Sequence, residues 1–437
     1  MASLHHGSSA GNESISRLPR NIGWLLGGKG FGGLVSLVYL AAAARTLGPV
    51  RFGIFALVLT YAQLIANLIQ FQSWKGVIRF GAIHTAAAQS KQLARLLGFT
   101  AILDWTAAIA GALVAAVGVL LVAPQFSWGG DVELYAALFA AALLLTTGAT
   151  PSGMLRLFDR FDLLAYAEAT SPIVRLIGAV AVWATGGDIA EFLAVWVLAA
   201  VVQTIVTWAA AIRIHRAHLT INRETLRLVL KENPGLWKFM WQASLSSSLG
   251  FIWMQTGVLA VGAFAGPAMA GGFRLADRIA GAIARPAETL TRALYPELVR
   301  LVARDDQARL RALFRRTVMV SVVVAILLVL FCATEGRLLL RLVGGGAFAF
   351  AQPFLVILAA STAIDLAGLA LEPVLNAHGK ASEVLRARIV GALVYIVLLL
   401  VLIPMVGPVG AALAAAVSCA IMVGMLSLSA RGLLLRR

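Results

Sequence analysis

Several ionisable side chains stand together inside one apolar stretch of the sequence, residues 268–297. They are Arg274, Asp277, Arg278, Arg285, Glu288 and Arg292. The four arginines are separated by 4, 7 and 7 residues, so on a helix they fall within an arc of ~40°. A guanidinium group binds phosphate well because its planar fork donates two parallel hydrogen bonds. The spacing therefore predicts a cationic stripe that faces a polar cavity or charged partners, and its guanidinium groups are suited to an anionic ligand.

This stripe also has a structural interpretation. Asp277 and Glu288 are suited to neutralise it, and Arg285 and Glu288 have the i,i+3 spacing of a helical ion pair. Arg292 lies near one end of the stretch, where its side chain is long enough to reach lipid phosphates. Binding and structural pairing therefore both remain open for these arginines.

Other polar residues inside apolar segments are candidates for the same cavity. Lys29 and Arg175 come from the first half of the chain and would complete a cationic surface, the alternative being a buried pair with Asp104. Gln255 and Thr256 are expected to line the cavity, whereas the nearby serines of 244–248 favour close helix packing. Carboxylates that could couple transport to protons or sodium, or simply pair with a neighbouring cation, are Asp104, Asp277, Glu168, Glu288 and Asp365.

The sequence offers no set of residues for catalysis or metal binding. None of the six histidines has metal-ligand spacing with Cys or carboxylates inside a segment, and no GxxxxGK[ST] phosphate loop occurs. We therefore expect a transporter rather than an enzyme. It would use no cofactor, and its energy would come from a proton or sodium gradient.

The composition places the chain in a membrane. Of its 437 residues 60% are apolar and 13% are charged, and the mean hydropathy is +0.88. Soluble proteins are about 45–50% apolar and about 25% charged. The apolar runs extend over the whole length, which excludes a soluble enzyme with one anchor and a disordered protein. The net charge of +16 indicates basic cytoplasmic loops rather than nucleic-acid binding.

Twelve membrane-spanning segments are predicted, of about 20 residues or more each. They are 21–46, 52–74, 95–123, 132–153, 163–186, 189–212, 237–265, 268–297, 317–335, 351–373, 385–405 and 408–430. With both termini in the cytoplasm, 26 of the 36 Lys and Arg residues fall in inner loops and 4 in outer loops, the other 6 lying inside segments. Leaving out 268–297 would turn the basic loop after it outward, so the positive-inside rule predicts that this charged segment crosses the membrane.

A repeat divides the chain into halves. The pattern GPxxxGxFxL begins at Gly48 and again at Gly266, an offset of half the chain. Because each half has an even number of crossings, we expect two six-helix bundles related by a pseudo-two-fold axis along the membrane normal. The predicted parts are a cytoplasmic tail (1–20), a first bundle (21–212), a basic linker (213–236), a second bundle (237–430) and a second tail (431–437).

The sequence resembles a known transporter family. The stretches 47–57, 272–278, 294–298 and 406–413 together are similar to the polysaccharide transporters, the Wzx-type oligosaccharide flippases of the multidrug/oligosaccharidyl-lipid/polysaccharide (MOP) exporter superfamily. The resemblance covers nearly the whole chain. It implies an all-α, MATE-like fold of two bundles that alternates between inward and outward openings.

The resemblance also implies the cargo, an undecaprenyl-pyrophosphate-linked oligosaccharide for O-antigen, capsule or exopolysaccharide synthesis. It would move from the cytoplasmic to the periplasmic leaflet of a bacterial inner membrane. Glycosyltransferases and a polymerase of the same pathway would be partners, besides membrane lipids. The alternative is a small-molecule or drug exporter of the same superfamily, whose cavity should be acidic rather than rich in arginine.

Overall fold

The computed structural model describes residues 7–126, 128–214, 223–284, 307–378 and 380–434, and every regular element among them is a helix. In the first half these are α1 (Gly7–Ile69), α2 (Ser73–Ala86), α3 (Ser90–Val122), η1 (Ala123–Phe126), α4 (Asp131–Leu145), α5 (Ala149–Leu157), α6 (Phe161–Thr185) and α7 (Ile189–Ile214). The later ones are α8 (Arg223–Glu232), α9 (Leu236–Ala265), a helix at 267–284, α11 (Gln307–Gly344), η2 (Gly346–Ala351), α12 (Gln352–Gly368), α13 (Leu371–Ala377), α14 (Ala381–Val406) and α15 (Val409–Leu434).

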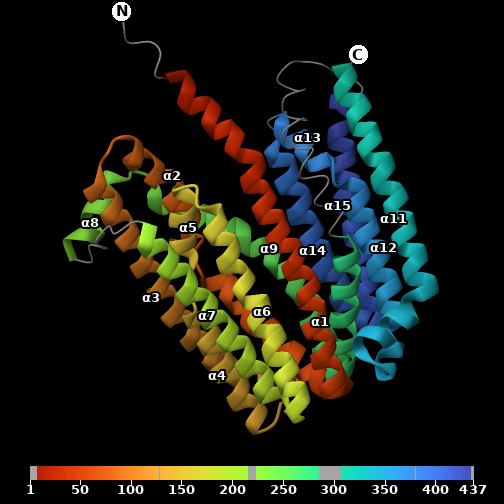
Figure 1. The fold of residues 1–437 in the computed structure, drawn as a ribbon. Coiled ribbons are helices and arrows are strands. Elements are labelled where there is room, and N and C mark those ends of the chain that lie inside the picture. The colour runs from red at the N-terminus through yellow and green to blue at the C-terminus, as the bar shows by residue number, and fades with distance from the viewer. Residues whose placement is uncertain (1–6, 127, 215–222, 285–306, 379, 435–437) are drawn as a thin grey trace, which may run out of the picture.

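The helices confirm an all-α polytopic membrane protein. Within the described residues, nine continuous helical stretches are long and apolar enough to span a membrane. The first, Val35–Ala86, contains a break in the helical backbone at Gly48 where the chain turns back, so it holds two passes (Figure 1). Adding α9 and the helix at 267–284 gives the twelve passes that the sequence predicts. The helix start at Gly7 lies earlier than the predicted 21, and α8 forms inside the predicted linker.

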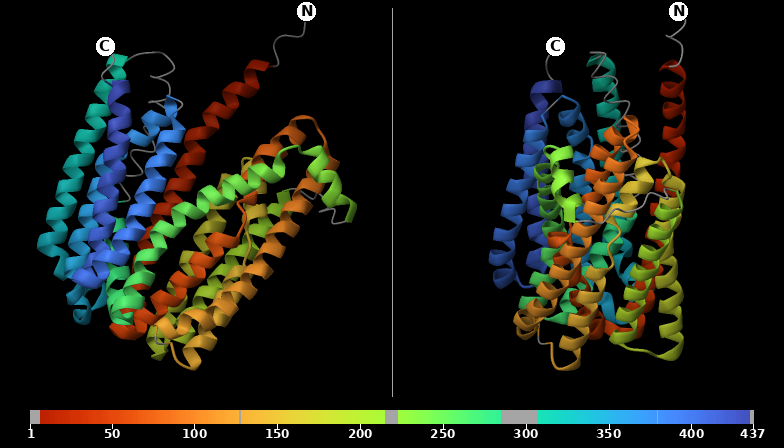
Figure 2. Two further views of the ribbon diagram at one scale, coloured as in Figure 1. Left: turned by 180° about the vertical axis from the view of Figure 1, so that it is seen from behind. Right: turned by 90° about the vertical axis from the view of Figure 1, so that its left-hand side faces the viewer.

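The passes form two arms that converge at one end and diverge at the other (Figure 1, Figure 2). One arm contains α2 to α7, and the other contains the helix at 267–284, which packs against α11 and η2, together with α11 to α15. Both chain termini lie at the diverging end. Helix α1 packs against α6 and α7 of its own half and against α9 and α11 of the other half. The two halves of the sequence thus correspond to two helical bundles joined at one end.

The repeated sequence pattern lies where the arms converge. Gly48 has φ 69° and ψ 175°, and Gly266 has nearly the same conformation, φ 83° and ψ 173°. Both φ values are in the left-handed region that favours glycine. Each glycine ends one pass, and the following proline begins the next helix, where its fixed φ is favourable. The matching backbone at these two positions agrees with the repeat that the sequence predicts.

The two repeats also touch each other. A Cβ atom on Gly53 would lie 1.8 Å from the carbonyl oxygen of Pro267, and one on Gly271 would lie 3.0 Å from backbone atoms of Gly53. Small residues allow helix backbones to approach closely within a membrane. Beside this crossing, Phe52 of the first half packs edge-on against Phe348 of the second, with 5.5 Å between ring centroids. The convergent end is therefore a tightly packed crossing of the two halves.

Two passes of the first arm are interrupted part-way. Helix α1 ends at Ile69 and α2 begins at Ser73, while α4 ends at Leu145 and α5 begins at Ala149. Asp104 of α3 joins both interruptions. Its carboxylate accepts hydrogen bonds from the Ser73 hydroxyl, from the Thr150 backbone N–H at 2.9 Å and from the Thr150 hydroxyl at 2.6 Å. One buried carboxylate thus holds the first turns of α2 and α5 together.

We expect Gly53→Ala to lower the free energy of unfolding by about 1–3 kcal/mol, because the added methyl group would overlap the Pro267 carbonyl and push the repeats apart. Gly424→Ala is the matched control, since a Cβ atom there meets open space inside α15, and helix propensity should make this change neutral or stabilising by up to about 1 kcal/mol. The measurement is the apparent melting temperature of both variants in detergent. Equal melting temperatures would contradict the close crossing.

Candidate functional site

Arg274 is buried between the two halves of the molecule. It belongs to the helix at 267–284, and only 3% of its surface is exposed. Its guanidinium donates to the side-chain oxygens of Gln255 on α9 (3.4 Å) and Gln63 on α1 (3.5 Å), and the Gln255 amide donates to Gln63 at 3.2 Å. These long hydrogen bonds connect one charged side chain of the second half with a polar residue of the first. The amides are neutral, so these hydrogen bonds do not themselves neutralise its positive charge.

Arg175 approaches the same region from the first half. Its guanidinium lies 3.7 Å from the centroid of the Trp196 ring, and Tyr39, whose ring packs edge-on against Trp196 at 5.5 Å between centroids, lies close to it. Arg278 is close enough for its charge to act on both Arg175 and Arg274. The stacking on tryptophan is a cation–π contact, which favours a guanidinium without neutralising it. We call Arg175, Arg274 and Arg278 the arginine cluster.

The described residues around the arginine cluster bring little negative charge. Asp277 is the one carboxylate among them whose charge acts on Arg274, and it also acts on Tyr395. Three guanidinium groups against one carboxylate leave an excess of positive charge inside the membrane-spanning part of the molecule. Such an excess is costly unless an anion joins it. The arrangement can bind phosphate oxygens with donors from both halves.

The structure brings together several of the residues that the sequence predicts as a site. Arg274, Arg278, Arg175, Gln255 and Asp277 meet as described, and Thr256 is the partly buried neighbour of Gln255. Lys29 lies on α1, but its side chain is outside the described part. Arg285, Glu288 and Arg292 lie outside the described residues altogether.

The other predicted carboxylates lie elsewhere. Asp104 does not pair with Arg175 but binds Ser73 and Thr150. Asp365 is on α12, where its charge acts on Arg388. The serines of α9 pack against the first half, as when Ser248 donates to the Asn67 carbonyl at 2.9 Å. These contacts support a packing role for the serines.

Two members of the site are not found by the sequence reasoning. Gln63 and Tyr39 occur singly in apolar segments, where one polar residue is common and has many explanations. The one sequence feature that could have pointed to Gln63 is that it interrupts the apolar run at 54–66. No spacing rule connects it with residue 274 of the other half. Only the packing of α1 against the second half shows the connection.

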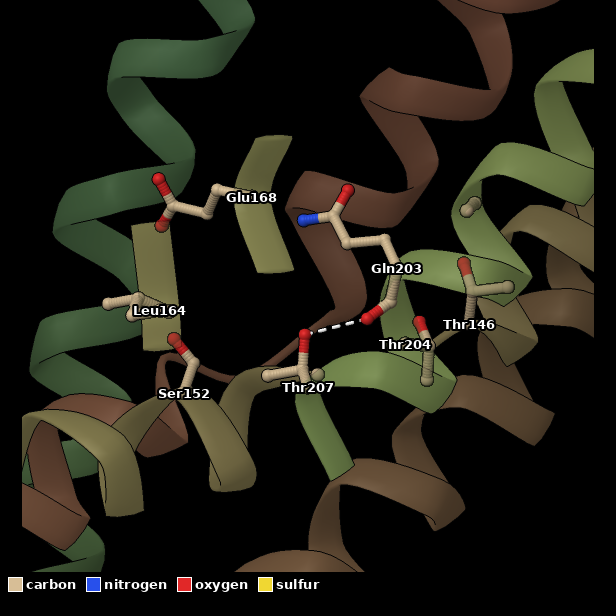
Figure 3. A pocket seen from close by; sticks show the side chains of 9 residues that line it. Thr146, Ser152, Leu164, Glu168, Gln203, Thr204 and Thr207 are labelled. Atoms are coloured by element: carbon tan, nitrogen blue, oxygen red, sulfur yellow. Dashed lines mark hydrogen bonds between the residues drawn. The ribbon is translucent and has the colours of Figure 1, made fainter. Parts of the chain in front are cut away.

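A separate cavity of about 210 Å³ lies within the first arm. It is lined mainly by polar residues of α5, α6 and α7 and of the interruption before α5 (Figure 3). They are Thr146, Gly148, Ser152, Leu164, Glu168, Ala200, Gln203, Thr204 and Thr207. The Glu168 carboxylate lies 3.8 Å from the guanidinium of Arg156, a loose ion pair. The cavity therefore combines one carboxylate with amide and hydroxyl groups.

Comparisons with known sequences agree with these features. A sequence profile of the family described as "Polysaccharide biosynthesis protein" matches residues 18–302. The chain is also 30% identical over 297 residues to the inner membrane protein YghQ of Escherichia coli (strain K12), covering 66% of this chain and 82% of that protein.

Solved structures share the fold. The lipid II flippase MurJ in an inward closed conformation has a TM-score of 0.72 at 13% identity, covering 93% of this chain and 87% of that one. An inward-facing multidrug resistance MATE family transporter of the MOP superfamily has a TM-score of 0.69 at 13% identity, covering 92% and 94%. At these identities the structures establish a common architecture of two bundles.

We expect Asp104→Ala to lower the free energy of unfolding by at least roughly 1–3 kcal/mol, because it leaves buried donors of Ser73 and Thr150 without an acceptor. Asp162→Ala is the control, since Asp162 is a partly exposed partner of Arg160 and such pairs contribute about 0–1 kcal/mol. Melting temperatures in detergent distinguish the two. A loss for Asp162→Ala as large as that for Asp104→Ala would refute the special role of Asp104.

Proposed function

The chain belongs to the family of polysaccharide biosynthesis proteins, and from that premise we propose that it is a flippase for a lipid-linked oligosaccharide. The family membership confirms the resemblance seen in the sequence. In this proposal the cargo is an undecaprenyl-pyrophosphate-linked glycan for O-antigen, capsule or exopolysaccharide synthesis. It moves from the cytoplasmic to the periplasmic leaflet of a bacterial inner membrane.

The arginine cluster is the observation that carries the proposal. Arg175 comes from the first half and Arg274 and Arg278 from the second, so an anion between them contacts both arms. A pyrophosphate presents several oxygens that match the paired donors of guanidinium groups. Lys29, Arg285 and Arg292 are the further cations that we assign to this binding surface, with Gln255 and Thr256 as polar neighbours.

The arrangement of the arms supports alternating access. They touch at the crossing of Gly53, Pro267 and Gly271 and diverge toward the end where both termini lie (Figure 1). We place both termini in the cytoplasm, because the loops at that end carry most of the Lys and Arg residues. The structure then represents a state that opens inward. Transport requires the crossing to open while the other ends close.

Energy for transport would come from a proton or sodium gradient rather than from a bound cofactor. Asp277 is the first candidate for coupling, because its charge acts on Arg274 in the arginine cluster. Protonation of this carboxylate would raise the net positive charge beside the anion. Asp104, Glu168, Glu288 and Asp365 are the remaining candidates.

A small-molecule exporter is the competing function, because a multidrug resistance transporter has the same architecture. The excess of arginine over carboxylate in the described site disfavours cationic drugs, which a cavity of like charge repels. The competing function predicts that loss of the protein leaves glycolipids unchanged.

In a strain that lacks this protein and any second flippase, we expect an oligosaccharide-lipid intermediate to accumulate in the cytoplasmic leaflet. The intact gene should restore its export. Arg274→Ala, Arg278→Ala and Arg175→Ala should each reduce export about ten-fold or more, since a charge-assisted hydrogen bond contributes roughly 1.5–3 kcal/mol. The corresponding lysine variants should retain part of the activity, because the charge remains but the paired donors are lost.

Arg386→Ala is the matched control, since Arg386 is exposed on α14 and, among the described residues, pairs with Glu383, three residues before it. Accumulation is measured by extracting lipid-linked sugars and testing their leaflet distribution. Normal export in all three alanine variants at normal expression would make the arginine cluster structural. Unchanged glycolipids in the deletion strain would favour the exporter.

A further inference from the structure

The polar cavity of the first arm is aligned with the arginine cluster. Glu168 precedes Arg175 by seven residues on α6, and Gln203 follows Trp196 by seven residues on α7. Seven residues are nearly two helical turns, so each pair shares a helix face about 10 Å apart. Because α6 and α7 run in opposite directions, both steps lead the same way, toward the end where the arms diverge (Figure 1). The cavity therefore lies beyond Arg175 along one face of these two helices.

The side chains of this cavity have hydrogen-bonding capacity to spare. In the part of the chain that the structure describes, the Gln203 amide and the hydroxyls of Ser152 and Thr204 make no hydrogen bond, and Glu168 has only its loose contact with Arg156. Figure 3 shows Glu168 and Gln203 among the side chains that line the cavity. Polar groups inside membrane-spanning helices normally have partners. Their side chains thus present free donors and acceptors to a ligand.

The chemistry of the lining selects the kind of ligand. A carboxylate repels phosphate, so the anionic part of a lipid-linked glycan does not belong here. The lining has two apolar side chains, Leu164 and Ala200, too few for an apolar drug. Carboxylate, amide and hydroxyl groups together accept from and donate to alcohol groups. A cavity of 210 Å³, the volume of roughly seven liquid waters at about 30 Å³ each, suits one sugar ring.

We infer that this cavity is a sugar subsite, which holds the ring nearest the pyrophosphate of the lipid-linked glycan. The inference rests on the proposed function and identifies the residue that recognises the sugar. The arginine cluster holds the pyrophosphate, and the Glu168 carboxylate accepts hydrogen bonds from hydroxyls of the first ring. Gln203 and Thr204 contact the same ring from α7. Glu168 is then a specificity residue rather than an ion-coupling residue.

Binding of defined lipids to the full chain in lipid nanodiscs tests the inference. The probes are undecaprenyl pyrophosphate and the same lipid carrying one N-acetylglucosamine, N-acetylgalactosamine, glucose or galactose. We expect the wild type to bind at least one sugar-bearing lipid about ten-fold more tightly than the sugar-free lipid, as one or two hydrogen bonds to a charged group allow. In Glu168→Gln this ratio should fall several-fold.

Thr204→Val removes one hydroxyl of the cavity with little change in volume and should also lower the ratio. It provides a second test if the Glu168 variant fails to fold. Thr185→Val is the matched control on α6, because the Thr185 hydroxyl bonds only carbonyls of its own helix, and its ratio should equal that of the wild type. A wild type that binds every lipid equally, or a ratio unchanged in both cavity variants, overturns the subsite and leaves the flippase proposal standing.

Two further outcomes separate the alternatives. A wild type that binds none of the five lipids overturns the flippase proposal and the subsite with it. The melting temperature of each protein is also compared in sodium chloride and in choline chloride. Stabilisation of the wild type by sodium that is lost in Glu168→Gln, with an unchanged lipid ratio, would make the cavity a cation site and overturn the sugar assignment.

Discussion

The contact between the two GPxxxG elements is the constraint on which the rest of the architecture depends. Gly53 and Gly271 have no side chain, so the backbones of the two repeats meet directly at Pro267 and Pro49. Such a contact is held by van der Waals packing, since the hydrophobic effect does not drive helices together within lipid. Among the described residues, no buried ion pair has to break when this contact opens. A crossing of this kind closes one end of the molecule and leaves the opposite ends of the arms free to separate.

The arginine cluster connects ligand binding to that crossing, because its members come from both arms. Arg175 on one arm and Arg278 on the other repel each other, and burial makes the charge of Arg175 costlier. An anion between them replaces repulsion with attraction on both sides. A ligand shifts a conformational equilibrium only when it binds one state better than the other. An anion held by both arms meets that condition, because its affinity depends on the distance between them.

The sequence predicts the cluster better than its surroundings. Arg175, Arg274 and Arg278 can be picked out from the sequence because a charge inside an apolar segment is energetically costly. The half-chain repeat then predicts two bundles that could bring them together. The interruptions at 70–72 and 146–148 place polar residues in segments that remain apolar overall, and such residues also occur in unbroken helices, so the sequence pattern does not identify them. Asp104 illustrates the consequence. Its partners are the helix starts that those interruptions create, not the cations that charge alone suggests.

A separation of phosphate binding from sugar binding follows from the chemistry of the proposed cargo. The pyrophosphate and the lipid are common to all glycans built on the same carrier, so the arginines supply affinity without selecting a sugar. Discrimination needs polar groups that lose partners when the wrong sugar binds. Glu168 meets this need nearly two helical turns from Arg175 on α6, and Gln203 is equally far from Trp196 on α7. Different sugar specificities could then arise from changes in this one cavity, while the arginine cluster and the crossing of the repeats stay as they are.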